Sequence, residues 1–69
     1  MFDLLITIYE RFDSRSLWDD IRGYRCNLTD MGEKSLIYGY CTLLEAINII
    51  TICKKYTDNM SVSLENEQV

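Results

Sequence analysis

Residues 29–57 read TDMGEKSLIYGYCTLLEAINIITICKKYT, and the fold that we predict from the sequence depends on this stretch. It contains no proline, and either Thr29 or Asp30 can cap the start of a helix. Glu33 follows Asp30 at the spacing of a capping box. The next polar cluster that could end a helix is Thr57-Asp58-Asn59. We therefore predict a single helix of about 27 residues, which would be about 40 Å long.

When the residues of this helix are placed about 100° apart, an apolar stripe and a line of small residues run side by side. The stripe would seat two shorter helices and consists of Leu36, Tyr40, Leu43, Ile47 and Ile50. The small residues predict a close helix contact, either within the chain or across a dimer seam, at Ser35, Gly39, Thr42, Ala46 and Cys53. A glycine inside a helix costs about 1 kcal/mol relative to alanine, and a close-packed neighbour would account for that cost.

A third group of residues lies beyond the line of small residues and is predicted to form a partner or dimer interface. It consists of Tyr38, Glu45, Ile49, Ile52 and Tyr56. Isoleucines in the C-terminal half of the helix point nearly all around its axis, and a helix that is apolar all round is a buried helix. We favour homodimerisation through this half. A different protein partner and cover by the C-terminal tail are the alternatives.

Two shorter helices are predicted ahead of the long one. Residues 2–12 place Phe2, Leu5, Tyr9 and Phe12 at helical spacing, although Leu4, Ile6 and Ile8 also alternate as in a strand. The second helix is expected to begin at Ser16, which can cap it, and to end near Gly23. Its candidates for burial are Leu17, Trp18, Ile21 and Tyr24.

These elements predict an all-α fold: a small three-helix domain in which two short N-terminal helices pack on one long C-terminal helix. The domain would span residues 1–59. Residues 60–69 are polar and are expected to form a flexible tail, although Met60, Val62 and Leu64 alternate like a short edge strand.

The chain has 69 residues, so its core is small and a domain of this size usually needs further support. The sequence holds three cysteines in no CxxC spacing and no histidine, so we expect neither disulfides nor a metal site, and no cofactor. Reduced thiols and the lack of a basic leader predict a cytoplasmic protein. The nearly apolar run 41–53 contains Glu45 and is too short to cross a bilayer. A second copy or a protein partner is the support that remains.

Catalytic patterns are missing from the sequence, and we predict that the chain is not an enzyme. Histidine, the commonest general base, is absent, and the three glycines are isolated rather than gathered in a phosphate-binding loop. Cys26 could have a lowered pKa beside Arg22 and Arg25, but an ordinary reduced thiol is the simpler interpretation. Asp19 and Asp20 are better explained by the electrostatics of a helix start.

A net charge of −4 disfavours binding to nucleic acid on electrostatic grounds. Four arginines lie in the first 25 residues, but five acidic residues share that stretch. The predicted long helix also begins with acidic residues, whereas a recognition helix has basic and polar residues there.

The sequence therefore favours a small non-catalytic protein-binding module that inhibits or regulates a larger protein, of the kind common among phage and mobile-element proteins. A self-assembling structural dimer of helices is the first alternative. A nucleic-acid-linked transcriptional regulator is the second.

Overall fold

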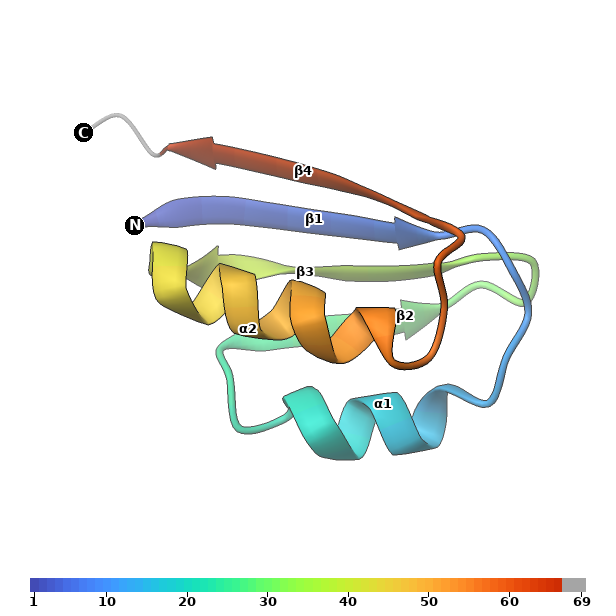
Figure 1. The fold of residues 1–69 in the computed structure, drawn as a ribbon. Coiled ribbons are helices and arrows are strands. Elements are labelled where there is room, and N and C mark those ends of the chain that lie inside the picture. Colours follow the sequence, from blue (N-terminus) through green and yellow to red (C-terminus); the bar gives the residue numbers. More distant parts are fainter. Residues whose placement is uncertain (67–69) are drawn as a thin grey trace.

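The computed structural model describes residues 1–66, which form one antiparallel sheet and two helices (Figure 1). The elements in chain order are β1 (Phe2–Ile8), α1 (Ser14–Ile21), β2 (Cys26–Asp30), β3 (Ser35–Cys41), α2 (Leu43–Lys54) and β4 (Met60–Asn66). The strand order across the sheet is β2-β3-β1-β4. The fold is therefore α+β, and the predicted all-α domain of three helices is wrong.

The topology consists of two interleaved split βαβ units. The units β1-α1-β2 and β3-α2-β4 each leave a gap between their strands, and a strand of the other unit fills it. This is the ferredoxin-like arrangement of elements. Because such folds host many unrelated functions, the topology by itself does not identify an activity.

Residues 2–8 form a strand rather than the predicted helix. Leu4, Ile6 and Ile8, the residues that alternate, are at most 1% exposed and face the helices. β1 bonds to β3 along one edge and to β4 along the other over its full length. The backbone N–H and C=O groups of β1 thus form hydrogen bonds to strands on both sides. A short helix over the same residues would have only the hydrogen bonds within itself.

The first part of the predicted long helix is a β-hairpin instead, formed by the end of β2, a turn and β3. The side chain of Asp30 accepts a hydrogen bond from the backbone N–H of Gly32 at 2.9 Å, and Gly32 has a φ of 84°, a conformation that favours glycine. The N–H of Met31 donates to the carbonyl of Lys34 at 2.8 Å and closes the turn between β2 and β3. Asp30 therefore begins a turn and does not cap a helix.

Only the C-terminal part of the predicted long helix is helical, because a capping box starts α2 at a later position. The Thr42 hydroxyl accepts from the N–H of Glu45, and the Glu45 carboxylate accepts from the N–H of Thr42, which is the N-cap residue. The pattern Thr-x-x-Glu ahead of an apolar run is a helix-start signal in its own right. α2 has 12 residues, about half the predicted length.

The predicted flexible tail is also wrong where the structure describes it. Residues Met60–Asn66 form β4, which pairs with the whole of β1, as the alternation of Met60, Val62 and Leu64 indicates. The predicted domain boundary at residue 59 therefore falls just before a strand of the sheet. Residues 67–69 of the predicted tail lie outside the described residues.

Both helices lie on one side of the sheet and enclose the core (Figure 1). α1 forms where the second short helix is predicted, but its N-cap is Asp13 rather than Ser16. It buries Leu17 and Ile21 completely, whereas Trp18 remains 38% exposed. The fully buried set of largest side chains consists of Leu4, Ile6, Ile8, Leu17, Ile21, Ile37, Ile49, Cys41 and Cys53. Neither helix of the described chain has the length and apolarity that a bilayer crossing requires.

Candidate protein-binding surfaces

The residues predicted to form one interface are divided among different surfaces. Ile49 is fully buried in the core, and Tyr38 lies on β3 with 43% of its surface exposed. Glu45, Ile52 and Tyr56 are half-buried and share one flank of α2 by helical spacing. The five side chains therefore do not meet, because Tyr38 belongs to a strand and the other four follow in or after α2.

The predicted close contact at small residues is likewise divided between β3 and α2. Ser35, Ala46 and Cys53 are buried at 3% exposure or less, and Thr42 caps α2. Gly39 lies in the middle of β3, where a Cβ atom would come within 2.3 Å of the carbonyl oxygen of Arg25. The glycine therefore accommodates a closely approaching backbone, but the neighbour is the segment entering β2 and not a helix.

The side of the sheet opposite the helices carries exposed apolar and aromatic side chains. Leu5 on β1 is 41% exposed, and Tyr38 and Tyr40 on the adjacent strand β3 are 43% and 52% exposed. Leu5 pairs directly with Tyr38 in the register of the two strands, and Leu36 lies on the same side. We call this group, Leu5, Leu36, Tyr38 and Tyr40, the tyrosine face.

One end of the tyrosine face is acidic. Asp3 pairs with Tyr40 on one side and with Glu65 of β4 on the other, so both carboxylates border the face. The four strands of the described chain contain no lysine or arginine. Sheets that bind nucleic acid combine aromatic stacking with cations, so the charge on this sheet is unfavourable for that function.

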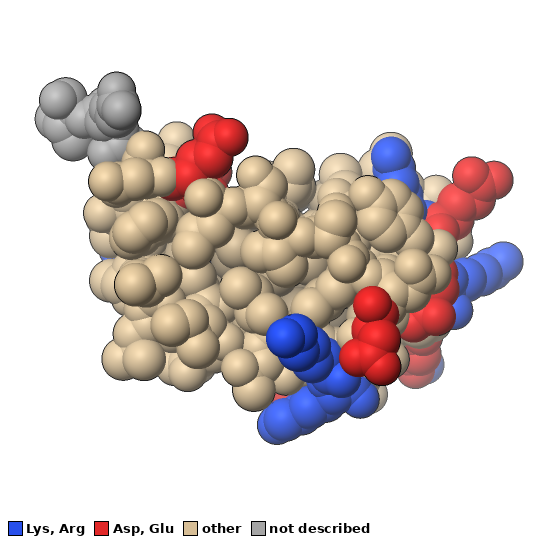
Figure 2. Space-filling model, turned by 45° about the horizontal axis from the view of Figure 1, so that its top comes forward, with Lys and Arg blue, Asp and Glu red and all other residues tan. Residues whose placement is uncertain are grey.

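A second apolar surface lies between α2 and β4. Leu43 and Ile47 are both 50% exposed, and Val62 on β4 is 42% exposed. Leu43, Ile47 and the half-buried Ile50 follow helical spacing on the flank of α2 opposite Glu45 and Tyr56, which contact the α1 side. Figure 2 shows a broad surface with almost no charged side chains over β4 and the N-terminal half of α2. We call Leu43, Ile47 and Val62 the α2–β4 flank.

Neither the tyrosine face nor the α2–β4 flank is recognised when residues 29–57 are interpreted as one helix. Tyr38 and Tyr40 share a face only at the two-residue period of a strand, and helical spacing separates them. The sequence predicts that Leu43 and Ile47 seat the short helices, but in the structure α1 lies on the opposite flank of α2. The sequence signal for the tyrosine face is the two-residue spacing of Leu36, Tyr38 and Tyr40, which is the period of a strand.

A shallow groove of about 300 Å³ runs between α1 and the edge strand β2. Its lining consists of Ser14, Arg15, Trp18, Leu28 and Asp30. The Arg15 side chain also pairs with Asp13 at 3.3 Å, so the cation at the rim is already partly neutralised. Among residues 1–66, no three or more His, Cys, Asp or Glu side chains are grouped so that they could hold a metal ion.

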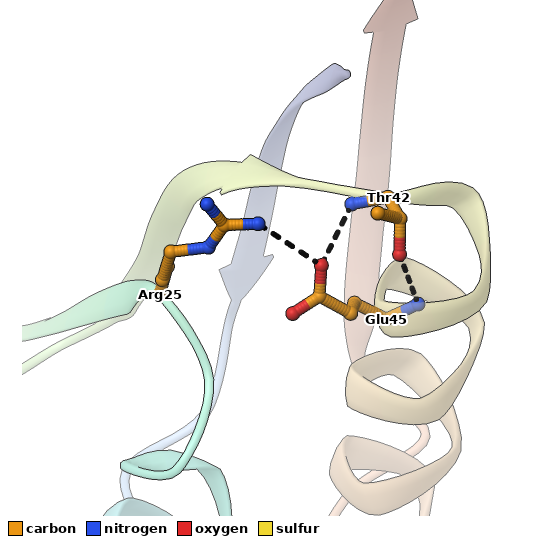
Figure 3. A network of polar contacts seen from close by, with 3 residues as sticks. All are labelled: Arg25, Thr42 and Glu45. Carbon is orange, nitrogen blue, oxygen red and sulfur yellow. Dashed lines mark hydrogen bonds and ion pairs between the residues drawn. The ribbon is translucent and has the colours of Figure 1, made fainter.

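Polar contacts at the start of α2 join Glu45 to Thr42 and to Arg25, which precedes β2 (Figure 3). The Glu45 carboxylate accepts from the backbone N–H of Thr42 at 3.0 Å and from the Arg25 guanidinium at 3.5 Å. The hydrogen bonds from Thr42 hold the pKa of Glu45 below its usual range, and the charge of Arg25 acts in the same direction. Glu45, which the sequence places at an interface, is therefore a helix-capping residue that also contacts the loop before β2.

The C-terminal end of α2 is attached to α1 by a tyrosine. The Tyr56 hydroxyl donates a hydrogen bond to the carboxylate of Asp20 and lies 3.4 Å from the carbonyl of Ser16. The hydrogen bond to Asp20 raises the pKa of Tyr56, because ionisation would remove the donated proton. Tyr56 therefore joins the two helices.

The three cysteines are free and buried. Burial raises the pKa of Cys26 and Cys41, and it raises the pKa of Cys53 to about 11. The possibility that Cys26 has a lowered pKa near Arg22 and Arg25 is therefore wrong. Since the thiolate is the reactive form, these thiols are poor nucleophiles at neutral pH.

No protein-family model matches this chain, and neither the curated proteins nor the solved structures contain a match to it.

Proposed function

We propose that this chain is a non-catalytic protein-binding module that binds a protein partner through the tyrosine face. The observation that carries the proposal is the pair Tyr38 and Tyr40, each about half exposed on a central strand and on the side of the sheet away from both helices. Tyrosine is enriched at protein interfaces because it offers a large contact area with few rotatable bonds and a hydroxyl group.

The charges around the tyrosine face specify the chemistry of the partner. Asp3 and Glu65 border the face, and the chain as a whole has a net charge of −4. The matching surface is an apolar patch on a protein, bordered by lysine or arginine. Such complementarity accelerates association and selects the partner more than it adds affinity.

The size of the domain supports regulation by occupying a surface. A standard interface covers about 800 Å² of each partner, which is about a sixth of the 4660 Å² surface of this chain. The strands that carry the face, β1 and β3, are each paired on both sides, so their backbone does not have to become ordered when the partner binds. A larger protein would be inhibited or redirected because its own binding surface is covered.

The test compares proteins retained by three immobilised chains: wild type, the double variant Tyr38→Ser/Tyr40→Ser, and the control Leu44→Ser. Leu44 is 68% exposed and lies on α2, on the other side of the sheet. We expect one protein to be retained by wild type and by the control but not by the double variant. With that protein purified, calorimetry should give a loss of affinity of about tenfold or more for the double variant.

The charge of the proposed partner provides a second measurement. Affinity for wild type should fall as salt is raised, and Asp3→Asn/Glu65→Gln should reduce that salt dependence. A partner that binds the folded double tyrosine variant as tightly as wild type would contradict the proposal. Circular dichroism of each variant establishes that its fold is intact.

A further inference from the structure

β4 is an edge strand whose outer side carries no pairing in the described chain. It extends over seven residues and contains no proline, lysine or arginine, which are the residues that commonly protect an edge. The other edge strand, β2, has five residues and packs beside α1. The outer backbone groups of β4 are thus the longest free row of hydrogen-bond donors and acceptors in the sheet.

The sequence of β4 is nearly symmetric about Val62. Residues 60–64 read Met-Ser-Val-Ser-Leu, so an antiparallel pairing of two copies places Val62 opposite Val62, Ser61 opposite Ser63, and Met60 opposite Leu64. The apolar residues then remain on one side of the joined sheet and the serines on the other. Glu65 falls opposite Asn59, so no two like charges face each other.

The α2–β4 flank lies on the same side as the apolar residues of β4. Val62, Leu43 and Ile47 are each between 42% and 50% exposed, so their apolar surface is available to a second copy. The only charged residue of α2 before Lys54 is Glu45, which points to Arg25 on the other flank. Because each chain carries a net charge of −4, two copies approach with least repulsion through this surface, which has almost no charged side chains (Figure 2).

We propose that two copies of the chain associate through β4, antiparallel, about a two-fold axis at Val62. The product is a continuous eight-stranded sheet with Leu43 and Ile47 of both copies on its helix-bearing side. Such an interface uses the same surface of each copy, which is the commonest symmetry of homo-oligomers. Both tyrosine faces stay uncovered on the opposite side, so the dimer does not depend on the function proposed for them.

The first experiment measures the solution mass by light scattering over a hundredfold dilution. Wild type should have twice the 8.1 kDa of one chain at high concentration and dissociate on dilution. Val62→Lys should have the mass of a single chain, because a lysine protects the edge and introduces charge into the pairing. The control Asn48→Lys adds the same charge at an exposed position on α2 and should remain a dimer.

The second experiment tests the register and does not depend on how Val62→Lys folds. Directly opposite strand residues have Cα atoms about 4.5–5.5 Å apart, within the range of a disulfide. Val62→Cys should therefore form a covalent dimer under mild oxidation. Glu65→Cys should not, because its two copies would be about 20 Å apart along the strands. The three native thiols are buried in the core.

The proposal is overturned by a wild-type mass of one chain at every concentration, by a folded Val62→Lys dimer, or by equal crosslinking of the two cysteine variants. Tyr38→Ser/Tyr40→Ser should leave the dimer mass unchanged. A failure of the dimer is thereby distinguished from a failure of partner binding at the tyrosine face.

Discussion

Gly39 lies directly beneath the carbonyl oxygen of Arg25, which would be 2.3 Å from a Cβ atom at that position. The Cα of Cys26 would be only 2.9 Å away. Both neighbouring atoms belong to the backbone, which cannot move aside as a flexible side chain can. The entry of the chain into β2 therefore depends on the absence of a side chain in the middle of β3.

Gly39→Ala should destabilise the protein by about 1–3 kcal/mol, the usual cost of forcing an extra group into a packed site. Urea unfolding followed by circular dichroism measures the change. Gly23→Ala is the matched control, because a Cβ there meets nothing within 4 Å. Equal stabilities of the two variants would show that Arg25 and Gly39 are not packed in this way.

Thr42→Ala should lower the free energy of unfolding by about 1 kcal/mol, because the N–H of Glu45 loses its acceptor at the start of α2. Thr51→Ala is the control. The hydroxyl of Thr51 donates at 2.8 Å to the carbonyl of Ile47, within the helix, and is not part of a cap. An equal or larger loss for Thr51→Ala would contradict the capping role of Thr42.

Glu45 should make the stability of the protein depend on pH in the acid range. The hydrogen bonds from Thr42 lower its pKa in the folded state below the ordinary value of 4.5. Protons therefore bind the unfolded chain more readily, so the contribution of Glu45 is complete above about pH 4.5 and is lost as the pH falls through the lowered pKa.

The measurement compares urea unfolding of wild type and Glu45→Gln between pH 7 and pH 3. The difference in stability should be constant above the ordinary pKa of 4.5 and should narrow below it. All other carboxylates are common to wild type and variant, so their contributions cancel in this difference. A difference that is the same at every pH would contradict the assignment.

Cys53 should resist thiol reagents at neutral pH, since it is fully buried and its pKa is raised to about 11. We expect labelling of the native protein to be slow and to become rapid when denaturant unfolds it. Val62→Cys introduces a thiol at an exposed position and provides the comparison. This variant is first reduced and diluted, so that its new thiol is neither in a disulfide nor covered by a second copy. Rapid labelling of native wild type would mean that the core around Cys53 opens readily.

The local signals in the sequence predict some elements well. The short helix α1 forms where Leu17 and Ile21 share a face, and Gly23 lies just beyond its end. The alternation of Met60, Val62 and Leu64 indicates the strand that the structure contains, whereas the polar composition of residues 60–69 predicts a flexible tail. The pattern Thr42-x-x-Glu45 is a local signal for the start of α2, and it lies inside the longer helix that the apolar periodicity of residues 29–57 predicts.

The residues of the interface predicted on the long helix do not share one surface, for a geometric reason. Tyr38 and Ile49 would share a face only if residues 35–54 were one helix. In the structure, Thr42 separates a strand from a helix, and the residue period changes from two to 3.6 at that point. Ile49 consequently faces the core, whereas Tyr38 faces away from the helices.

By itself, the sequence determined the acidic charge, the reduced state expected of three isolated cysteines, and the turn and cap residues that divide the chain. The tertiary structure alone decided that residues 2–8 and 35–41 are strands. Both segments contain apolar residues at helical as well as at alternating spacing, so local preference does not choose between the two. The choice comes from pairing: β1 bonds to β3 and β4 over its whole length, and those partners lie more than 25 residues away in the chain.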